Sequence, residues 1–280
     1  MTVIVVDTAP NDADRFFEPS SKIWQVNREM NLLLAGGRAL LMQLAHPKIA
    51  AGVAEHSRFQ EDPLARLYRT MNAMWSIVFD EQLDARAALQ SVERRHTQVR
   101  GVVPENEPSQ GGAPYDAFDQ ELLLWVHATL IDSALVAYHL FVAPLSPHER
   151  ITYYNDSKKL ASLFGIEEET IPVSLEAFEA YMKRMLLSDK IAVGRMAKRL
   201  AHDVLYPRPW IFKPGGPLFR FVTAGLLPET LRAGYDLRWS GRKEKRLALL
   251  ASMIRGLLPW VPTPLRIVPN ARVAEKAKQR

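Results

Sequence analysis

The sequence predicts an all-α protein with one main domain, and three observations support this. Apolar residues recur at three- and four-residue spacing through most of the chain after residue 20. Capping residues and prolines stand where helices would begin. Only Val3 to Val6 has the pattern of an extended strand. With 280 residues, 48% of them apolar, the chain can also bury a sizeable core.

The first expected helices follow from this spacing and these caps. Asn31 to Ser57 is rich in Leu and Ala, and Pro47 should break or kink it. Asp62-Pro63 is a capping residue followed by a proline at the first helical position. Asp84 opens the next helix only four positions after Asp80, so the two helices should form an antiparallel hairpin.

The rest of the chain is expected to be helical with a few breaks. Ser146 and Glu149 form a capping box, with Pro147 at the first helical position. Val103 to Pro114 and Tyr206 to Pro217 are rich in proline and glycine and should be loops. Helices are expected over about residues 119–142, 147–165, 174–185, 189–205, 218–227, 228–237 and 243–258.

The chain has no cysteine, which excludes several classes of site. Disulfides, thiolate zinc sites, iron–sulfur clusters, thiolate-bound or covalently attached c-type haem and a cysteine nucleophile all require that residue. No GxSxG motif supports a serine nucleophile either. Any metal or cofactor must therefore be held by His, carboxylate, Tyr or Met side chains.

The net charge of +5 is concentrated at the C-terminal end. Residues 241–280 hold ten Lys or Arg against two Glu, a net +8, so the remainder carries −3. This segment is either a solvated basic end or a surface that meets an anionic membrane, and no nucleic-acid motif accompanies it. We expect no nucleic-acid partner.

The location expected from the sequence is cytoplasmic, with a peripheral membrane contact as an open alternative. The N-terminus lacks the basic and apolar regions of a signal peptide. The most apolar region, Leu122 to Leu145, contains His127, Asp132 and His139, which indicates a buried helix rather than a membrane span. The aromatic segment Tyr206 to Phe221 either packs on the core as a loop, guards an entry channel or lies on a membrane.

Two clusters carry the candidate chemistry. His96 lies in the apolar stripe of its helix with Arg100 one turn further on, so the pair is either a metal-binding imidazole beside a guanidinium or a core histidine near an unrelated surface arginine. Arg66, Arg69 and Thr70 project from one helix, either toward a carboxylate or phosphate or into solvent. A helical hairpin would allow both clusters to open onto one pocket.

The chain resembles the family of rubber oxygenases (latex-clearing proteins) and MpaB-type oxygenases over roughly Asn27 to Trp239. The order and spacing of the short motifs carry the resemblance. They are Gln43-Leu44-Ala45-His46-Pro47, His56-Ser57-x-Phe59, Asp62-Pro63-x-x-Arg66-x-x-Arg69-Thr70, His96-x-x-x-Arg100-Gly101, Trp125-Val126-His127, Asp132-Ser133, Pro144-Leu145-Ser146-x-x-Glu149-Arg150 and Leu226-Leu227-Pro228-x-x-Leu231-Arg232.

This resemblance implies a globin-like helical fold around one non-covalent haem b. It places the proximal iron ligand at His96 and puts Arg100 beside that ligand, where it would fix the ring. It places Arg66 and Thr70 near the haem. The rubber oxygenase has a lysine that can close the iron at the position of Arg69; an arginine stays protonated, so a lysine-closed state is not expected here. This departure argues against polyisoprene as substrate more than against haem.

The implied activity is a haem-dependent oxygenase acting on a hydrophobic, unsaturated substrate, lipid or isoprenoid-like, with dioxygen bound on the open side of the iron. His56, His46 and Glu55 are the candidates for the base on that side, with His56 preferred, and Arg69 is the further candidate there. A non-oxygenase haem protein and a cofactor-free lipid-binding module remain alternatives. The expected organisation is an N-terminal extension (1–26), the haem domain (27–240) and a basic C-terminal helix and tail (241–280).

Overall fold

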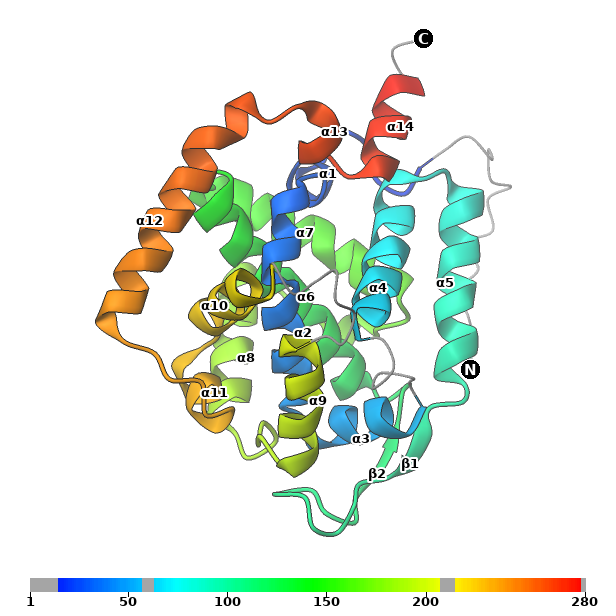
Figure 1. Cartoon of the computed structure of the whole chain (residues 1–280). Coiled ribbons are helices and arrows are strands. Elements are labelled where there is room, and N and C mark those ends of the chain that lie inside the picture. The colour runs from blue at the N-terminus through cyan, green and yellow to red at the C-terminus, as the bar shows by residue number, and fades with distance from the viewer. Residues whose placement is uncertain (1–14, 57–62, 207–214, 278–280) are drawn as a thin grey trace.

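The computed structural model describes residues 15–56, 63–206 and 215–277, and the side chains of residues 63–67 lie outside that description. The fold is all-α, as the sequence predicts: 71% of it is helical, and its sheet has two short strands (Figure 1). The extended stretch expected at Val3 to Val6 lies outside the described residues.

The helices and strands follow the sequence patterns closely. They are α1 (Lys22–Asn27), η1 (Met30–Ala35), α2 (Gly36–Leu44), α3 (Pro47–His56), α4 (Pro63–Phe79), α5 (Gln82–His96), β1 (Arg100–Val102), β2 (Pro114–Asp116), α6 (Gln120–Phe141), α7 (Pro147–Leu163), η3 (Glu168–Thr170), α8 (Leu175–Leu187), α9 (Arg195–Leu205), α10 (Gly216–Leu226), α11 (Glu229–Gly234), α12 (Gly241–Leu257), η5 (Leu258–Trp260), α13 (Thr263–Arg266) and α14 (Pro269–Ala277).

Capping residues and prolines explain the helix starts that agree with the sequence prediction. The hydroxyl of Ser146 accepts a hydrogen bond from the backbone N–H of Glu149, and the Glu149 carboxylate accepts one from the backbone N–H of Ser146. α7 therefore begins with the capping box predicted from the sequence. Pro47 begins α3 instead of kinking a longer helix, and α4 begins at Pro63.

Some elements differ from the expectation. α9 begins at Arg195 and not near residue 189, and the predicted 103–114 loop is the connection of a small antiparallel hairpin, β1–β2. α1, α13 and α14 were not predicted. They are short, and α1 and α14 are stabilised by contacts that no local pattern reveals, such as the burial of Ile23 and Trp24 in α1 and of Ala271 in α14.

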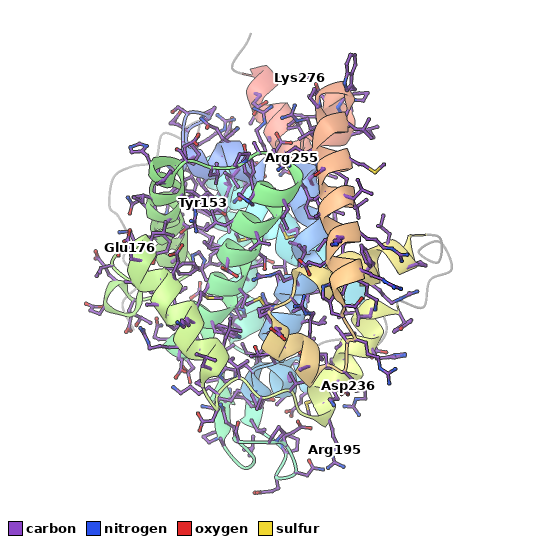
Figure 2. All side chains as sticks on the ribbon, turned by 90° about the vertical axis from the view of Figure 1, so that its left-hand side faces the viewer. Tyr153, Glu176, Arg195, Asp236, Arg255 and Lys276 are labelled. Atoms are coloured by element: carbon purple, nitrogen blue, oxygen red, sulfur yellow. The ribbon has the colours of Figure 1, made fainter. Side chains whose placement is uncertain are left out.

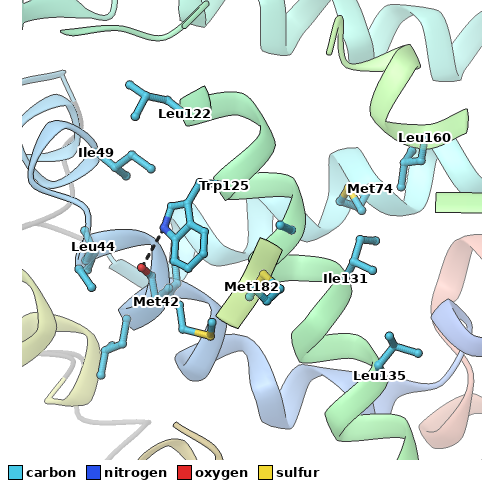
Figure 3. Close-up of a cluster of buried hydrophobic side chains, with 14 of the residues drawn as sticks. Met42, Leu44, Ile49, Met74, Leu122, Trp125, Ile131, Leu135, Leu160 and Met182 are labelled. Carbon is cyan, nitrogen blue, oxygen red and sulfur yellow. Dashed lines mark hydrogen bonds between the residues drawn. The ribbon is translucent and has the colours of Figure 1, made fainter. Parts of the chain in front are cut away.

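α6 is the central helix of the molecule and packs against η1, α2, α7 and α12. Trp125, in its second turn, is fully buried and donates a hydrogen bond from Nε1 to the carbonyl of Met42 at 3.2 Å (Figure 3). Apolar side chains from α2, α3, α4, α7 and α8 belong to the same buried cluster (Figure 3). Because a buried indole N–H needs a partner, this bond fixes the spacing of α2 and α6.

α6 is also the described helix that is long and apolar enough to cross a membrane by length and composition. Its 18-residue window is 56% buried inside the molecule. This burial agrees with the expectation that the apolar region around Leu122 forms a core helix.

A buried guanidinium ties α2 to α6 and α10. Arg38 donates to the carbonyl of Leu226 (2.8 Å), the hydroxyl of Ser133 (2.7 Å) and the carboxylate of Asp132 (2.5 Å). The charge is paired and three of its donors are used, which is the condition under which a buried arginine is tolerated.

The C-terminal elements return to the N-terminal ones. Arg266 in α13 donates to both oxygens of the buried Glu29 carboxylate, and Glu29 forms a backbone bridge with Ile267. Asn270 donates to Asp80 at the end of α4. α12, in contrast, lies along the outside of the molecule, at the upper left in Figure 1.

Candidate functional site

A cavity of about 610 Å³ lies among α3, α4, α5, the β1–β2 hairpin and α6. α4 and α5 form the predicted antiparallel hairpin and provide one wall, while α3 and α6 provide others. Its volume falls within the range of about 300–1,000 Å³ typical of small-molecule sites. All described lining residues lie between Gln43 and Ile166.

Apolar side chains provide most of the lining, but among the described residues it also contains eleven that are polar or charged. The apolar lining residues include Ile49, Val53, Met74, Val92, Val99, Leu122, Leu123, Val126, Leu130, Phe164 and Ile166. The polar and charged ones are Gln43, Lys48, His56, Arg69, Thr70, Arg95, His96, Gln98, Tyr115, Asp116 and His127. Such a site suits a ligand that is mostly apolar and also carries polar or charged groups.

His96 is the last residue of α5 and lines the cavity, half-buried. Its ring lies edge-on against Phe118, with 6.0 Å between ring centroids. The structure therefore brings the predicted iron ligand to the same cavity as Arg69 and Thr70 of α4, as the helical hairpin predicted.

Arg100 is placed differently from the expectation. Because α5 ends at His96, Arg100 belongs to β1 and does not lie one helical turn beyond the histidine. Its side chain is exposed and donates from Nη2 to the carbonyl of Thr97, the C-cap residue of α5, at 3.2 Å. The guanidinium therefore contacts the end of the helix that carries His96, and Arg100 does not line the cavity.

The structure describes two of the three side chains of the predicted α4 cluster. Thr70 is half-buried and Arg69 is exposed at the surface, and both line the cavity. Arg66 lies in the same helix, but its side chain is outside the described residues. Arg95 and Lys48 add two further cationic side chains to the lining, which sequence reasoning did not single out.

His56, the last residue of α3, also faces this cavity. Its Nε2 lies 3.0 Å from the backbone carbonyl of Arg100. Since a carbonyl can only accept a hydrogen bond, Nε2 carries the hydrogen and Nδ1 is the basic nitrogen of the neutral ring. His56 can therefore accept a proton at Nδ1.

Tyr115 and Glu55 form a hydrogen-bonded pair at the cavity wall. The hydroxyl of the buried Tyr115 donates to Oε2 of the exposed Glu55. Burial, and next the hydrogen bond to Glu55, raise the pKa of Tyr115, so the phenol stays protonated. Tyr115 lies at the edge of the predicted loop, and its sequence context contains no pattern that would have indicated this role.

The imidazole of His127 in α6 is buried and lines the same cavity. Burial lowers its pKa to about 4, although a hydrogen bond to the backbone of Ser157 acts in the opposite direction. His127 is therefore neutral at physiological pH. Because His127 lies in an apolar helix, the sequence predicts a core histidine. The structure shows that it is buried and also lines the cavity.

His46 is separated from the others. It lies in the turn between α2 and α3, is buried, and lines a second cavity of about 580 Å³ together with Asp119, Glu121 and Lys190. Burial lowers its pKa to about 4. The structure thus does not place His46 with His96, because the turn before Pro47 directs it to a different cavity.

Comparisons with known proteins show which family the chain resembles. A family model described as "ER-bound oxygenase mpaB/B'/Rubber oxygenase, catalytic domain" matches residues 24–256. An uncharacterised protein of Mycobacterium tuberculosis and one of Mycobacterium bovis are each 28% identical to the chain over 222 residues, which cover 77% of this chain and 84% of theirs. No solved structure matches the chain.

Proposed function

The chain belongs to the family of MpaB-type and rubber oxygenase catalytic domains, and from this premise we propose that it is a haem b-dependent oxygenase for a hydrophobic, unsaturated substrate. The observation that carries the proposal is the apolar cavity onto which His96, Thr70 and Arg69 converge. Membership of an oxygenase family supports an enzyme; the haem and the substrate class are the parts proposed here.

The residues of the cavity fit a haem. A haem needs one axial ligand from the protein, an apolar enclosure for the ring and cations for its propionates. The cavity offers the imidazole of His96, an apolar wall and the side chains of Arg69, Arg95 and Lys48. Among the described residues there is no group of three or more His, Asp or Glu side chains that could hold a bare metal ion.

Each side chain has a role in this proposal. His96 would hold the iron, and Arg100 would position it through the carbonyl of Thr97. Arg69, together with Arg66 of the same helix, would pair with a propionate, and Thr70 would donate a hydrogen bond beside it. When bound, haem b supplies an iron centre that activates dioxygen for oxidation of a carbon–carbon double bond.

The rest of the cavity would serve the substrate. The walls from α3, α5 and α6 would exclude water and hold an apolar chain, since their apolar side chains include Ile49, Val92 and Val126. His56 would take up or release a proton at Nδ1, because its Nε2 is held by the carbonyl of Arg100.

The first test of the proposal is the visible absorption spectrum of the protein with haem added. Purified protein supplied with haem should show a Soret band, and His96→Ala should abolish the band while its far-UV circular dichroism and melting temperature stay near those of the wild type. His202→Ala, at an exposed histidine outside the cavity, is the matched control and should keep the band. His127→Gln should also keep it; if His127→Gln abolishes the band and His96→Ala does not, the ligand has been assigned to the wrong imidazole.

Oxygen uptake then separates an oxygenase from a passive haem protein. Incubation of the loaded protein with unsaturated lipid extracts should consume dioxygen and yield products that contain its oxygen atoms, measured with ¹⁸O₂ and mass spectrometry. A protein that takes up no haem would rule out the haem proposal. A loaded protein that oxidises no unsaturated lipid would instead support a storage or sensing role.

A further inference from the structure

The outer face of α12 carries an apolar stripe that no other described element covers. The core side of this helix includes Leu247 and Ala251, which are buried against α6 and α10. The exposed fractions on the outer side are 63% for Leu249, 56% for Met253 and 60% for Leu257, and Trp260 in η5, directly after α12, is 84% exposed. Since each helical residue advances about 100°, Leu249 lies about 200° from Leu247, on the opposite side of the helix.

The same outer face begins with positive charge. Arg242, Lys245 and Arg246 lie in the first two turns of α12 and are exposed. Arg246 precedes Leu249 by three residues, so basic and apolar side chains follow one another along one face. Figure 2 views the molecule from this side and shows side chains standing out along the length of α12, with Arg255 near its end.

We propose that this face of α12 binds the surface of an anionic lipid membrane. Trp and aliphatic side chains insert at the boundary between headgroups and acyl chains, and Lys and Arg beside them attract anionic headgroups. Residues 241–280 carry a net charge of +8, which adds to this attraction. Two copies of the chain that met through this face would each bring positive charge to the contact, so the charge favours an anionic partner over a second copy.

The proposal is independent of the haem site. α12 lies on the opposite side of the molecule from α3 and from the β1–β2 hairpin, and residues of α3 and β2 line the cavity (Figure 1). None of the described lining residues belongs to α12, so the membrane surface and the cavity use different parts of the chain.

Flotation of the full chain with vesicles tests this surface. The protein should float with vesicles of phosphatidylcholine and phosphatidylglycerol, bind phosphatidylcholine vesicles more weakly, and be released from the anionic vesicles by high salt. A variant with Leu249→Ser, Met253→Ser and Trp260→Ser, and a second with Arg242→Glu, Lys245→Glu and Arg246→Glu, should each lose more than about tenfold in affinity. The matched control, Leu83→Ser with Val173→Ser, changes exposed apolar residues elsewhere and should bind normally.

Three results would overturn the proposal. The first is that the Arg242→Glu, Lys245→Glu, Arg246→Glu variant binds anionic vesicles as tightly as the wild type does. The second is a wild-type dimer, measured by light scattering without lipid, that the Leu249→Ser, Met253→Ser, Trp260→Ser variant converts to monomer, because the stripe would then contact a second copy. The third is a marked fall in the melting temperature of that variant, because the stripe would then be covered by the chain itself. Binding by His96→Ala should equal that of the wild type.

Discussion

Oε2 of Glu55 accepts a hydrogen bond from the hydroxyl of Tyr115 at 2.5 Å, and the backbone of Gly101 passes directly beside this pair. A Cβ atom on Gly101 would lie 2.6 Å from the Tyr115 oxygen and 2.9 Å from Oε2 of Glu55. Position 101 therefore requires a glycine, because its backbone lies too close to the Tyr115 hydroxyl to leave room for a Cβ atom.

We therefore expect Gly101→Ala to destabilise the protein by about 1–3 kcal/mol, the usual cost of overpacking. The ring of Tyr115 is buried and cannot move aside easily, whereas the exposed Glu55 can. Urea unfolding followed by circular dichroism measures the change. Gly256→Ala is the control: nothing lies within 4 Å of its Cβ in α12, so a gain of about 0.5–1 kcal/mol is expected there. Equal effects of the two substitutions would contradict the close approach.

Under the proposed haem function, Arg100→Ala should leave haem binding intact but shift the midpoint potential of the bound haem. The guanidinium holds the carbonyl of Thr97, and its loss frees the end of α5 that carries His96. Spectroelectrochemistry measures the potential, and Arg100→Lys should restore part of it because a lysine can also donate to this carbonyl. An unchanged potential in Arg100→Ala would count against a positioning role.

The stability of the protein should fall as the pH is lowered from about 6.5 to about 4. Burial lowers the pKa of His127 and of His46 to about 4, below the ordinary value of 6.5 that each has when unfolded. Between these values the unfolded chain binds protons that the folded chain does not, so each histidine removes about 1.4 kcal/mol of folding free energy per pH unit. The folding free energy is therefore undiminished above pH 6.5, and the loss due to the two histidines is complete near pH 4.

His127→Gln tests the origin of this slope. The glutamine has no proton to gain in this range, so the pH dependence of the unfolding free energy between pH 6.5 and 4 should become shallower. His202→Gln changes an exposed histidine and should leave the slope as it is. If both variants keep the wild-type slope, the acid sensitivity has another source.

Arg38→Ala should cost on the order of 3 kcal/mol of stability. It leaves Asp132, the hydroxyl of Ser133 and the carbonyl of Leu226 without the donor that now satisfies them. Arg150→Ala removes an exposed ion pair with Glu179 and should cost less than about 1 kcal/mol. Thermal unfolding of the two variants compares a buried with an exposed guanidinium. Similar losses would mean that the Arg38 network is not the tie between α2, α6 and α10.

The sequence predicted the helices that carry strong local patterns. Pro63 and the Ser146 capping box act within a few residues, so their effect can be read without knowledge of the fold. α14 could not be predicted in this way, because it is held by packing against α4 and by the bond from Asn270 to Asp80, which is 190 residues away in sequence.

The same distinction applies to the site. The expectation that Arg69, Thr70 and His96 could share one cavity followed from the helical hairpin, which places them on neighbouring helices. The helix end at His96, which moves Arg100 into β1, depends on a hairpin whose pairing with β2 is not visible in the sequence. His46 shares its family motif with the residues around it, but a single turn before Pro47 decides which cavity it reaches.

The cavity and the outer face of α12 are built from different parts of the chain. All described cavity residues precede residue 167, whereas the stripe lies beyond residue 241. Selection can therefore alter substrate preference and membrane attachment separately, as in a protein assembled from exchangeable modules. Relatives that share the cavity but differ in α12 would then carry the same chemistry to different places in the cell.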